Sequence, residues 1–247
     1  MESRLRVLVR RHPALRVFLR RYYPPRKALR RIMRPAILWP LLRTVRPISE
    51  KYGIDRGVPV DRYYIDAFLA ANAHHIRGVC LEVKDGTYTQ RYGGDMVDRV
   101  DIVDSDRSNP RATIYDDLRH PTVLRDGIYD CIILTQVLQF IDDVDVALRA
   151  SARLLKPGGT MLVTLPALSR IDLGGGVAGD FWRFTVAGAR QLFGRHFTVD
   201  RLEIRSWGNV LAGAAFWVGC AQEDCSRANL DYQDDQFPVI ISVVARA

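Results

Sequence analysis

Acidic and amide side chains recur where apolar runs of this 247-residue chain come to an end. Glu82 lies at the end of the run 78–83, Asp101 toward the end of the run 97–103, and Gln136 directly after the run 129–135. Carboxylates accept several hydrogen bonds at once, so they suit a ligand that offers two hydroxyl groups. A glutamine at the end of a buried strand needs partners for its amide, and a polar pocket supplies them. These residues therefore predict a site for a polar ligand at the ends of neighbouring strands.

The apolar runs alternate with helical patterns along the chain. Strands are expected at 78–83, 97–103, 113–115, 129–135, 160–165, 198–207 and 239–245, and helices at 61–75, 144–155, 186–193 and 209–220. Asp61 is the expected N-cap of the first helix and Thr185 that of the third. Strands separated by helices predict a parallel sheet with helices on both faces, in which ligands bind beyond the carboxyl ends of the strands. The predicted fold is α/β, a Rossmann-like, doubly wound sheet of seven strands.

Two motifs carry a resemblance to a known family. The sequence YDCIILTQVLQF begins at Tyr129, and LLKPGGTMLVTLP begins at Leu154 after an intervening helix. This layout resembles the second half of class I S-adenosylmethionine (SAM) dependent methyltransferases. The resemblance covers residues 60–247 and implies SAM as cofactor, with the last two strands forming an antiparallel edge pair.

The loop after the first strand departs from this family's pattern, which reads E/D-x-G-x-G-x-G. Glu82 and Gly86 match the pattern, whereas Lys84 stands at the first glycine position and Tyr88 at the third. In one interpretation Gly86 allows the close approach of the backbone to SAM and Lys84 lies near its methionine carboxylate. In the other, the site no longer binds SAM and the domain is an inactive scaffold that binds a membrane or a partner. The first is favoured because the other strand-end residues match.

The resemblance implies further contacts with SAM. Asp101 would accept hydrogen bonds from both ribose hydroxyls, with Asp104 as the rival candidate, and Gln136 would lie close to the cofactor. Asp117 and Leu118 would meet the adenine. On the helix that covers the cofactor mouth in this fold, the residue assigned to SAM is Tyr63, with Arg62 and Tyr64 as alternatives.

Catalysis by such an enzyme depends mainly on alignment, because SAM carries the reactive group. A hydroxyl acceptor also benefits from a general base, and Asp180 is the candidate catalytic residue. Trp182 either stacks on a sugar face or packs in the core. A narrower resemblance rests on residues 53–65 and 180–185. It is to bacterial methyltransferase-domain proteins that accompany glycosyltransferases, and it implies O-methylation of a sugar, a glycan or a glycosylated metabolite, with a glycosyltransferase as partner.

Charge divides the chain into an arm, residues 1–47, and a methyltransferase domain, residues 48–247. The arm holds 14 Lys/Arg and one acid, Glu2, a net of +13; the remainder holds 22 Lys/Arg and 27 Asp/Glu, a net of −5. Apolar residues at helical spacing within 4–23 predict a basic amphipathic helix. Such an arm fits an anionic membrane surface or a partner protein, or is simply a solvated extension. Nucleic acid is disfavoured, because no stacking aromatics of an RNA-binding motif interleave the arginines.

The four cysteines, Cys80, Cys131, Cys220 and Cys225, show no metal-ligand spacing. No metal site or disulfide framework is therefore expected, and a reducing, cytoplasmic compartment fits best. No apolar run reaches the roughly 18–20 residues of a membrane span. The expected location is the cytoplasm, with the arm at the inner face of the membrane.

Overall fold

The computed structural model describes residues 45–172 and 179–247. The chain divides into two units, Met1–Pro47 and Ile48–Ala247, and the fold described below is that of the second. The basic amphipathic helix expected within residues 4–23 lies outside the described residues.

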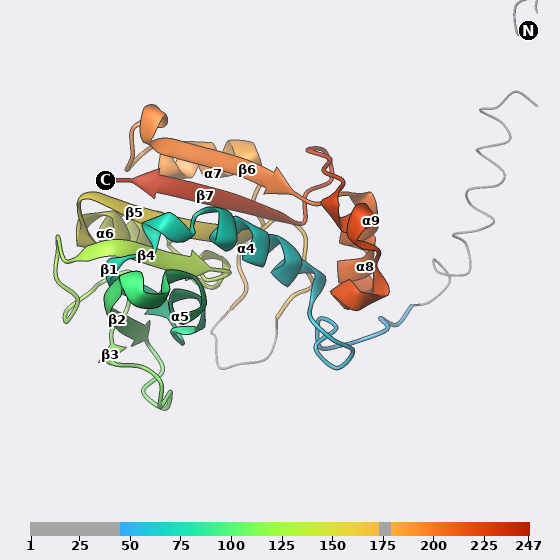
Figure 1. Ribbon diagram of the computed structural model, residues 1–247, viewed down its shortest axis with the longest axis horizontal. Helices are drawn as coiled ribbons and strands as arrows, with labels where there is room; N and C mark the ends of the chain where they lie inside the picture. Colours follow the sequence, from blue (N-terminus) through green and yellow to red (C-terminus); the bar gives the residue numbers. More distant parts are fainter. Residues whose placement is uncertain (1–44, 173–178) are drawn as a thin grey trace, which may run out of the picture. The chain divides into compact units, whose positions relative to one another are not determined.

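A seven-stranded sheet forms the centre of the second unit (Figure 1). Its strands are β1 Gly78–Val83, β2 Val97–Asp104, β3 Ile114–Tyr115, β4 Tyr129–Thr135, β5 Leu155–Pro166, β6 Leu202–Trp207 and β7 Ile240–Arg246. The order is β3-β2-β1-β4-β5-β7-β6, so β3 and β6 are the edges. Neighbours from β3 to β5 are parallel, and β7 is antiparallel to both β5 and β6. The predicted doubly wound sheet of seven strands is thus confirmed, with its antiparallel edge pair.

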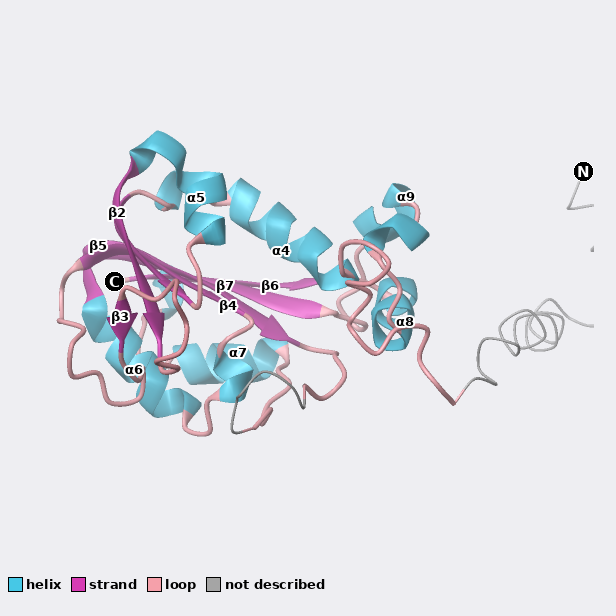
Figure 2. Ribbon diagram, turned by 90° about the horizontal axis from the view of Figure 1, so that it is seen from below, coloured by secondary structure: helices cyan, strands magenta, loops and turns pink. Residues whose placement is uncertain are grey.

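Helices cover both faces of the sheet, which explains the continuous apolar runs of the central strands. Figure 2 shows α4 (Val60–Ala71) and α5 (Thr87–Gly93) on one side, and α6 (Val144–Leu154) and α7 (Val186–Phe193) on the other. The sheet packs against α4 and α8 (Val210–Val218) in one buried cluster, and against α6 and α7 in the other. The short helix α9 (Arg227–Asp231) adjoins α8. No helix in the described part of the chain is both long and apolar enough to cross a bilayer.

The start of α4 differs from the prediction. The helix begins at Val60 with Pro59 as N-cap, so the prediction of Asp61 as N-cap is wrong. Asp61 lies in the first turn, on the buried face that also holds Tyr64 and Ile65. The prediction for α7 is confirmed, because the Thr185 hydroxyl accepts a hydrogen bond from the Gly188 N–H at 3.0 Å.

Two local features have no counterpart in the sequence pattern. The helix α5 is short, and the carboxylate of Glu82, six residues upstream of its second residue, accepts from its first N–H groups. The strand β5 begins at Leu155, so the Pro-Gly-Gly segment is an irregularity inside the strand, with Gly158 at φ 80°, rather than a turn before it. The connection between β2 and β3, residues 105–113, is described throughout and contains no helix.

Candidate active site

The side chain of Glu82 anchors the loop after β1 through hydrogen bonds to the backbone. Its side chain is buried, and its two carboxylate oxygens accept from the Tyr88 N–H at 3.1 Å and the Thr89 N–H at 2.8 Å. Burial raises the pKa of Glu82, and the donors of Thr89 and Tyr88 offset part of that rise. A carboxylate at a helix N-terminus is favourable, so Glu82 holds the loop and α5 in register.

Lys84 adopts a backbone conformation that glycine favours. Its φ is 71°, in the left-handed region that glycine adopts without strain. Its N–H donates to the Val103 carbonyl at 3.0 Å, and its carbonyl accepts from the Asn109 side chain at 2.7 Å. The Lys84 side chain is exposed. The loop after β1 therefore turns through a left-handed residue at the position of the first glycine in the family pattern, although that residue is a lysine.

Replacing Lys84 by glycine is expected to raise the free energy of unfolding by about 0.5–1 kcal/mol, because the left-handed conformation costs a non-glycine residue about 1–2 kcal/mol and glycine loses part of that gain in unfolded-state entropy. Lys84→Ala is the matched control, since it removes the same side chain but keeps the strain. Chemical denaturation measures both. An equal gain in the two variants would show that the lysine charge, and not the backbone, is responsible.

Gly86 leaves space beside the loop. Its φ is not positive, and a Cβ there would lie 3.4 Å from Ile102 Cδ1, an ordinary contact. Neither the backbone nor the packing of the protein therefore requires glycine at this position. Gly86 lines one end of a hollow of about 960 Å³ between α5 and β2. The hollow is open because no helix follows β2 to cover that face of the sheet.

The structure corrects the placement of Asp101. Asp101 pairs with Leu81 in the middle of the two strands, and its carboxylate accepts from the Tyr129 hydroxyl at 3.0 Å and from Arg99 at 3.1 Å. Asp104 is the residue at the carboxyl end of β2. It is nearly buried, and its oxygens accept from the Asp106 N–H at 2.9 Å and from Asn109 Nδ2 at 2.8 Å. Each oxygen keeps a further lone pair, and of the two carboxylates Asp104 is the one that lies at the carboxyl end of the strand.

The loop after β3 places Asp117 and Leu118 in different settings. Arg119 donates to Asp117 through Nε and Nη2 and reaches Asp142 through Nη1, at 2.7–3.1 Å. These hydrogen bonds lower the pKa of Asp117. The side chain of Leu118 is buried in the core. Asp116 holds the loop, because its carboxylate accepts from the backbone N–H groups of residues 122–124.

Gln136 directly follows β4 and adopts φ 54°. Its N–H donates to the Thr164 carbonyl at 3.0 Å, and its own carbonyl accepts from Gln139 Nε2 at 2.9 Å. Its side-chain Nε2 is buried and has no hydrogen-bond partner in the protein. A buried donor of this kind is costly unless a ligand accepts from it.

The first turn of α4 brings Asp61 and Arg62 to the loop after β1. Asp61 Oδ2 accepts from Arg62 at 3.3 Å, whereas its buried Oδ1 has no partner. Burial alone would lower the pKa of Arg62, but the charges of Asp61, Tyr88, Asp66 and Asp85 hold it above its ordinary value. Tyr88 and Asp85 belong to the β1 loop and α5, so Arg62 faces them.

Tyr63 points elsewhere. Its hydroxyl donates to Asp231 of α9, and its ring packs edge-on against Tyr64, with the ring centres 5.4 Å apart. Tyr64 is fully buried and donates to the Leu230 carbonyl at 3.0 Å. Of the three candidates on this helix, Arg62 is therefore the residue that the structure brings to the loop after β1.

Asp180, the predicted catalytic residue, is bound in an ion pair. Its two oxygens accept from Arg183 at 2.6 and 2.7 Å, and one also accepts from the Asp172 N–H at 3.0 Å. Only 2% of its side chain is exposed. Burial raises the pKa of Asp180, but the hydrogen bonds from Arg183 and Asp172 outweigh it and lower the pKa. A buried carboxylate with a low pKa and two strong donors is a poor base, so this arrangement disfavours Asp180 as the general base.

Arg183 instead joins the residues just after β5 to Asp180 by hydrogen bonds. It donates to the carbonyls of Ser169 at 3.3 Å and Arg170 at 2.8 Å, as well as to Asp180. The two residues before it are hydrogen-bonded to the segment that follows β4. The Phe181 N–H donates to the Gln139 carbonyl, and Trp182 Nε1 donates to the Ile141 carbonyl, at 2.8 and 2.9 Å.

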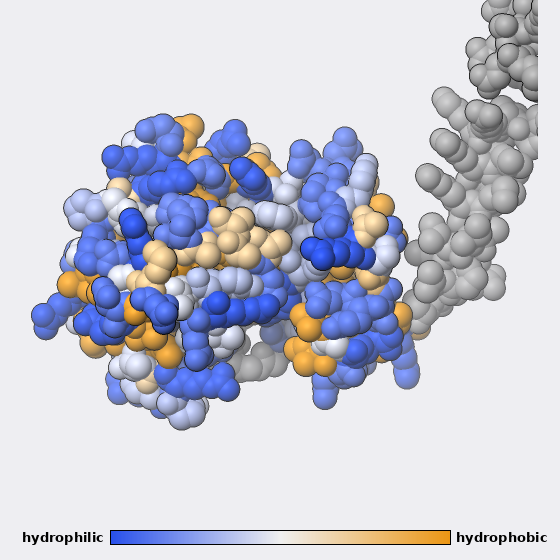
Figure 3. Space-filling model, viewed as in Figure 1, coloured by the Kyte–Doolittle hydropathy of each residue, from blue (hydrophilic) through white to orange (hydrophobic). Residues whose placement is uncertain are grey.

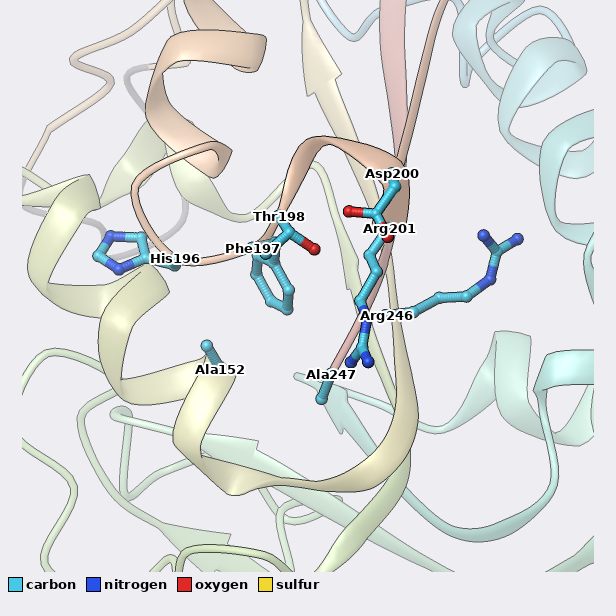
Figure 4. Close-up of a pocket in the computed structure, with 8 residues that line it drawn as sticks. All are labelled: Ala152, His196, Phe197, Thr198, Asp200, Arg201, Arg246 and Ala247. Carbon is cyan, nitrogen blue, oxygen red and sulfur yellow. The ribbon is translucent and has the colours of Figure 1, made fainter.

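A second hollow of about 440 Å³ lies at the opposite end of the sheet (Figure 4). His196, Arg201 and Arg246 are among the residues that line it, and Arg246 ends β7 next to the amino ends of the parallel strands. Ligands of doubly wound sheets bind at the other end, so this hollow is not part of the candidate site. Within residues 45–172 and 179–247, no three His, Cys, Asp or Glu side chains form a group that could hold a metal ion.

The sequence motifs did not indicate Asp61 as a site residue, and they placed Arg62 only as an alternative to Tyr63. A signal for Asp61 was present, because it lies at helical spacing with the apolar residues Val60, Tyr64, Ile65 and Phe68 and so belongs to the buried stripe. An acid in that stripe is buried, and a buried acid needs a partner. The pairing of Asp180 with Arg183, three residues apart outside a helix, had no comparable signal.

Comparison with known proteins agrees with this geometry. Residues 49–208 match the family model described as "Methyltransferase domain". No curated protein matches the chain significantly. Among solved structures, a SAM-dependent methyltransferase from Mesorhizobium loti is 16% identical, with 76% of this chain and 100% of that chain covered and a TM-score of 0.50. One from Archaeoglobus fulgidus is 10% identical, with 75% and 94% covered and a TM-score of 0.50. Since the family model spans well over half of the chain, the chain belongs to the methyltransferase domain family and is an enzyme of the SAM-dependent class.

Proposed function

We propose that the enzyme transfers the methyl group of SAM to a hydroxyl group of a sugar, a glycan or a glycosylated metabolite. The observation that supports a ligand site most directly is the distribution of buried polar atoms without a partner. Among the described residues there are seven, on Asp61, Thr89, Gln136, Gln139, Ser151, Thr164 and Arg170. All except that of Ser151 follow or adjoin the carboxyl ends of β1, β4 and β5, or begin α4. Proteins satisfy nearly all buried polar groups, so such a concentration at one edge favours a ligand there.

The residues of this edge fit the parts of SAM. Asp104 would accept from the ribose hydroxyls, and Gln136 would donate a hydrogen bond nearby. Asp61 and Arg62 offer a carboxylate and a guanidinium side by side, which complement the ammonium and the carboxylate of the methionine part. The backbone of residues 84–86 would approach the cofactor closely, and Asp117 with Leu118 would border the adenine. SAM supplies an electrophilic methyl group, and these contacts orient it and exclude water.

Replacing Asp61 by asparagine is expected to weaken SAM binding roughly tenfold, because a charge-assisted hydrogen bond to the ammonium is lost. The same change should raise the stability of the unliganded protein at pH 7. Burial raises the pKa of Asp61, so its ionised form opposes folding above that pKa, and the difference should vanish below about pH 4, where the unfolded residue is also protonated. Calorimetry and pH-dependent denaturation separate the two effects. A variant that is destabilised and binds SAM normally would show a purely structural role.

Two aromatic residues support a sugar as the acceptor. Phe181 and Trp182 are 48% and 43% exposed beside the carboxyl ends of β4 and β5. The hydrogen bond from Trp182 Nε1 to the Ile141 carbonyl fixes the indole ring. A fixed, exposed aromatic face packs against the C–H face of a sugar ring, while the sugar hydroxyls stay near polar groups. A glycosyltransferase as partner and a location at the inner face of the membrane belong to the same proposal.

Titration of the full chain with SAM and with S-adenosylhomocysteine, followed by product analysis with a panel of sugars and lipid-linked glycans, tests the proposal. Bound SAM stabilises the folded state by RT ln(1 + [L]/Kd), so a thermal shift confirms the calorimetry. Micromolar binding and methylated sugar products would support it. Binding without any sugar product would place the acceptor in another class. The inactive scaffold is the less favoured alternative. It predicts that about 1 mM SAM gives no binding heat and no shift of the melting temperature.

A further inference from the structure

The helix α8 is apolar on every side. None of its nine residues, VLAGAAFWV, carries a polar side chain. Ala212 and Phe216 face the core, but Val210, Leu211 and Trp217 are 61%, 44% and 53% exposed. A surface helix ordinarily shows polar residues on its outer face, so an apolar outer face indicates a contact with another apolar phase.

The chain before α4 enlarges this apolar area. The Ile48 N–H donates to the Val218 carbonyl at 2.7 Å, and the Tyr52 ring lies over Phe216, with the ring centres 6.1 Å apart. In this segment Ile48 and Ile54 are 46% and 65% exposed. We call Ile48, Ile54, Val210, Leu211 and Trp217 the α8 surface. Figure 3 shows hydrophobic residues exposed at this end of the second unit.

The α8 surface adjoins the candidate active site. The helix begins three residues after the end of β6, and β6 ends level with the carboxyl end of β5, with β7 between the two strands. A Cβ on Gly213 would lie 3.0 Å from Leu168 Cδ2, so α8 packs directly on the segment that follows β5. That segment carries Arg170 and, at its other end, Phe181 and Trp182.

The strongly basic residues 1–47 directly precede the α8 surface in the sequence. Residues 1–47 carry 14 Lys/Arg and one acid, and they lead directly into Ile48, the residue hydrogen-bonded to α8. Basic residues near a bilayer contribute about 1 kcal/mol each through anionic headgroups, and inserted Leu and Trp side chains contribute apolar burial. An anionic bilayer offers both a negatively charged surface for the basic residues and an apolar phase for the exposed side chains of α8.

We propose that the α8 surface docks on an anionic phospholipid bilayer, with Leu211 and Trp217 inserted at the headgroup boundary and the basic residues of 1–47 bound to the headgroups. The active-site edge then lies next to the membrane. This rests on the membrane location named under the proposed function and deepens it by assigning the docking surface, whereas docking itself requires neither SAM nor a particular acceptor.

The test is co-sedimentation of the full chain with phosphatidylcholine vesicles and with vesicles of equal parts phosphatidylcholine and phosphatidylglycerol. The double variant Leu211→Gln/Trp217→Gln should lower the partition coefficient on anionic vesicles about a hundredfold, because each buried side chain of this size contributes about tenfold or more. Val199→Gln is the matched control. Val199 is 75% exposed near the amino end of β6, away from α8, so its replacement should change binding less than twofold.

Three other outcomes of the vesicle experiment would count against the proposal or part of it. Equal binding of the double variant and the wild type would overturn the proposal and assign binding to the basic residues alone. Equal binding to neutral and anionic vesicles would remove the role of charge, and a wild-type chain that stays in solution with both would end the proposal. The melting temperature and SAM affinity of the double variant should match those of the wild type. If the wild-type protein does not bind SAM, the proposed function is refuted, but the result with vesicles still decides whether the α8 surface docks on a bilayer.

Discussion

Replacing Asp104 by alanine is expected to lower the affinity for SAM about a hundredfold. Two hydrogen bonds from ribose hydroxyls to a carboxylate contribute about 1.5 kcal/mol each, and together they correspond to a factor of about 10². Asp101→Ala should leave the affinity within about threefold, because its carboxylate lies mid-strand and is used by Tyr129 and Arg99. Isothermal titration of both variants with SAM measures the contrast.

Asp104 also holds its own loop, so a control must separate binding from loop order. Asn109→Ala is suited to this, because Asn109 donates to both the Asp104 carboxylate and the Lys84 carbonyl. Its removal loosens the two loops and leaves the carboxylate in place. We expect a loss of less than about fivefold. If Asn109→Ala weakens binding as much as Asp104→Ala, the ribose assignment is refuted.

Replacing Arg183 by alanine is expected to destabilise the fold by about 3–5 kcal/mol, because it leaves the Asp180 carboxylate buried and unpaired. For a domain of this size, that loss lowers the melting temperature by about 10 °C. Arg195→Ala is the matched control, since Arg195 pairs with Asp145 on the surface, where both side chains are largely exposed. It should cost less than about 1 kcal/mol. Calorimetric melting distinguishes the two.

The dependence on pH gives a second measure of this pair. Because the folded-state pKa of Asp180 is lowered, its contribution to stability is complete above the unfolded pKa near 4 and is lost as the pH falls through the folded value. The difference between wild type and Arg183→Ala should therefore shrink below about pH 4. A difference that stays constant down to pH 2 would mean that Arg183 acts through the Ser169 and Arg170 carbonyls alone. The double change Asp180→Leu/Arg183→Met should recover part of the stability, because no unpaired charge remains.

The fold could be predicted because its signals are periodic. The elements β1, β4 and α7 consist mostly of apolar residues, and their predicted bounds match the observed ones. The helix α5 escaped prediction because it is seven residues long and depends on the Glu82 carboxylate, at the end of β1, to accept from the N–H groups of Tyr88 and Thr89. Short helices of this kind are stabilised by tertiary contacts rather than by their own sequence.

The site was harder to predict because it depends on register. Asp101 and Asp104 lie three residues apart on one strand, and only the pairing of Val103 with Val83 shows which of them lies at the edge. The residue type of Lys84 left two interpretations of the loop open, and only the structure shows that this lysine adopts a left-handed backbone conformation, with φ 71°. The role of Asp180 could not be read from the sequence, because its partner was set by the folding of the segment after β5.

The two edge strands affect how the molecule behaves in concentrated solution. An exposed edge strand is a template on which another chain can add, and proteins avoid this with short strands or charged ones. Here β3 has two residues, and β6 alternates exposed Glu203 and Arg205 with partly buried neighbours, with Glu203 paired to Arg246 at 2.5 Å. Neither edge offers a long, uncharged row of backbone groups. Strand addition is therefore disfavoured at both ends of the sheet, so we expect the folded domain to resist edge-to-edge aggregation at high concentration.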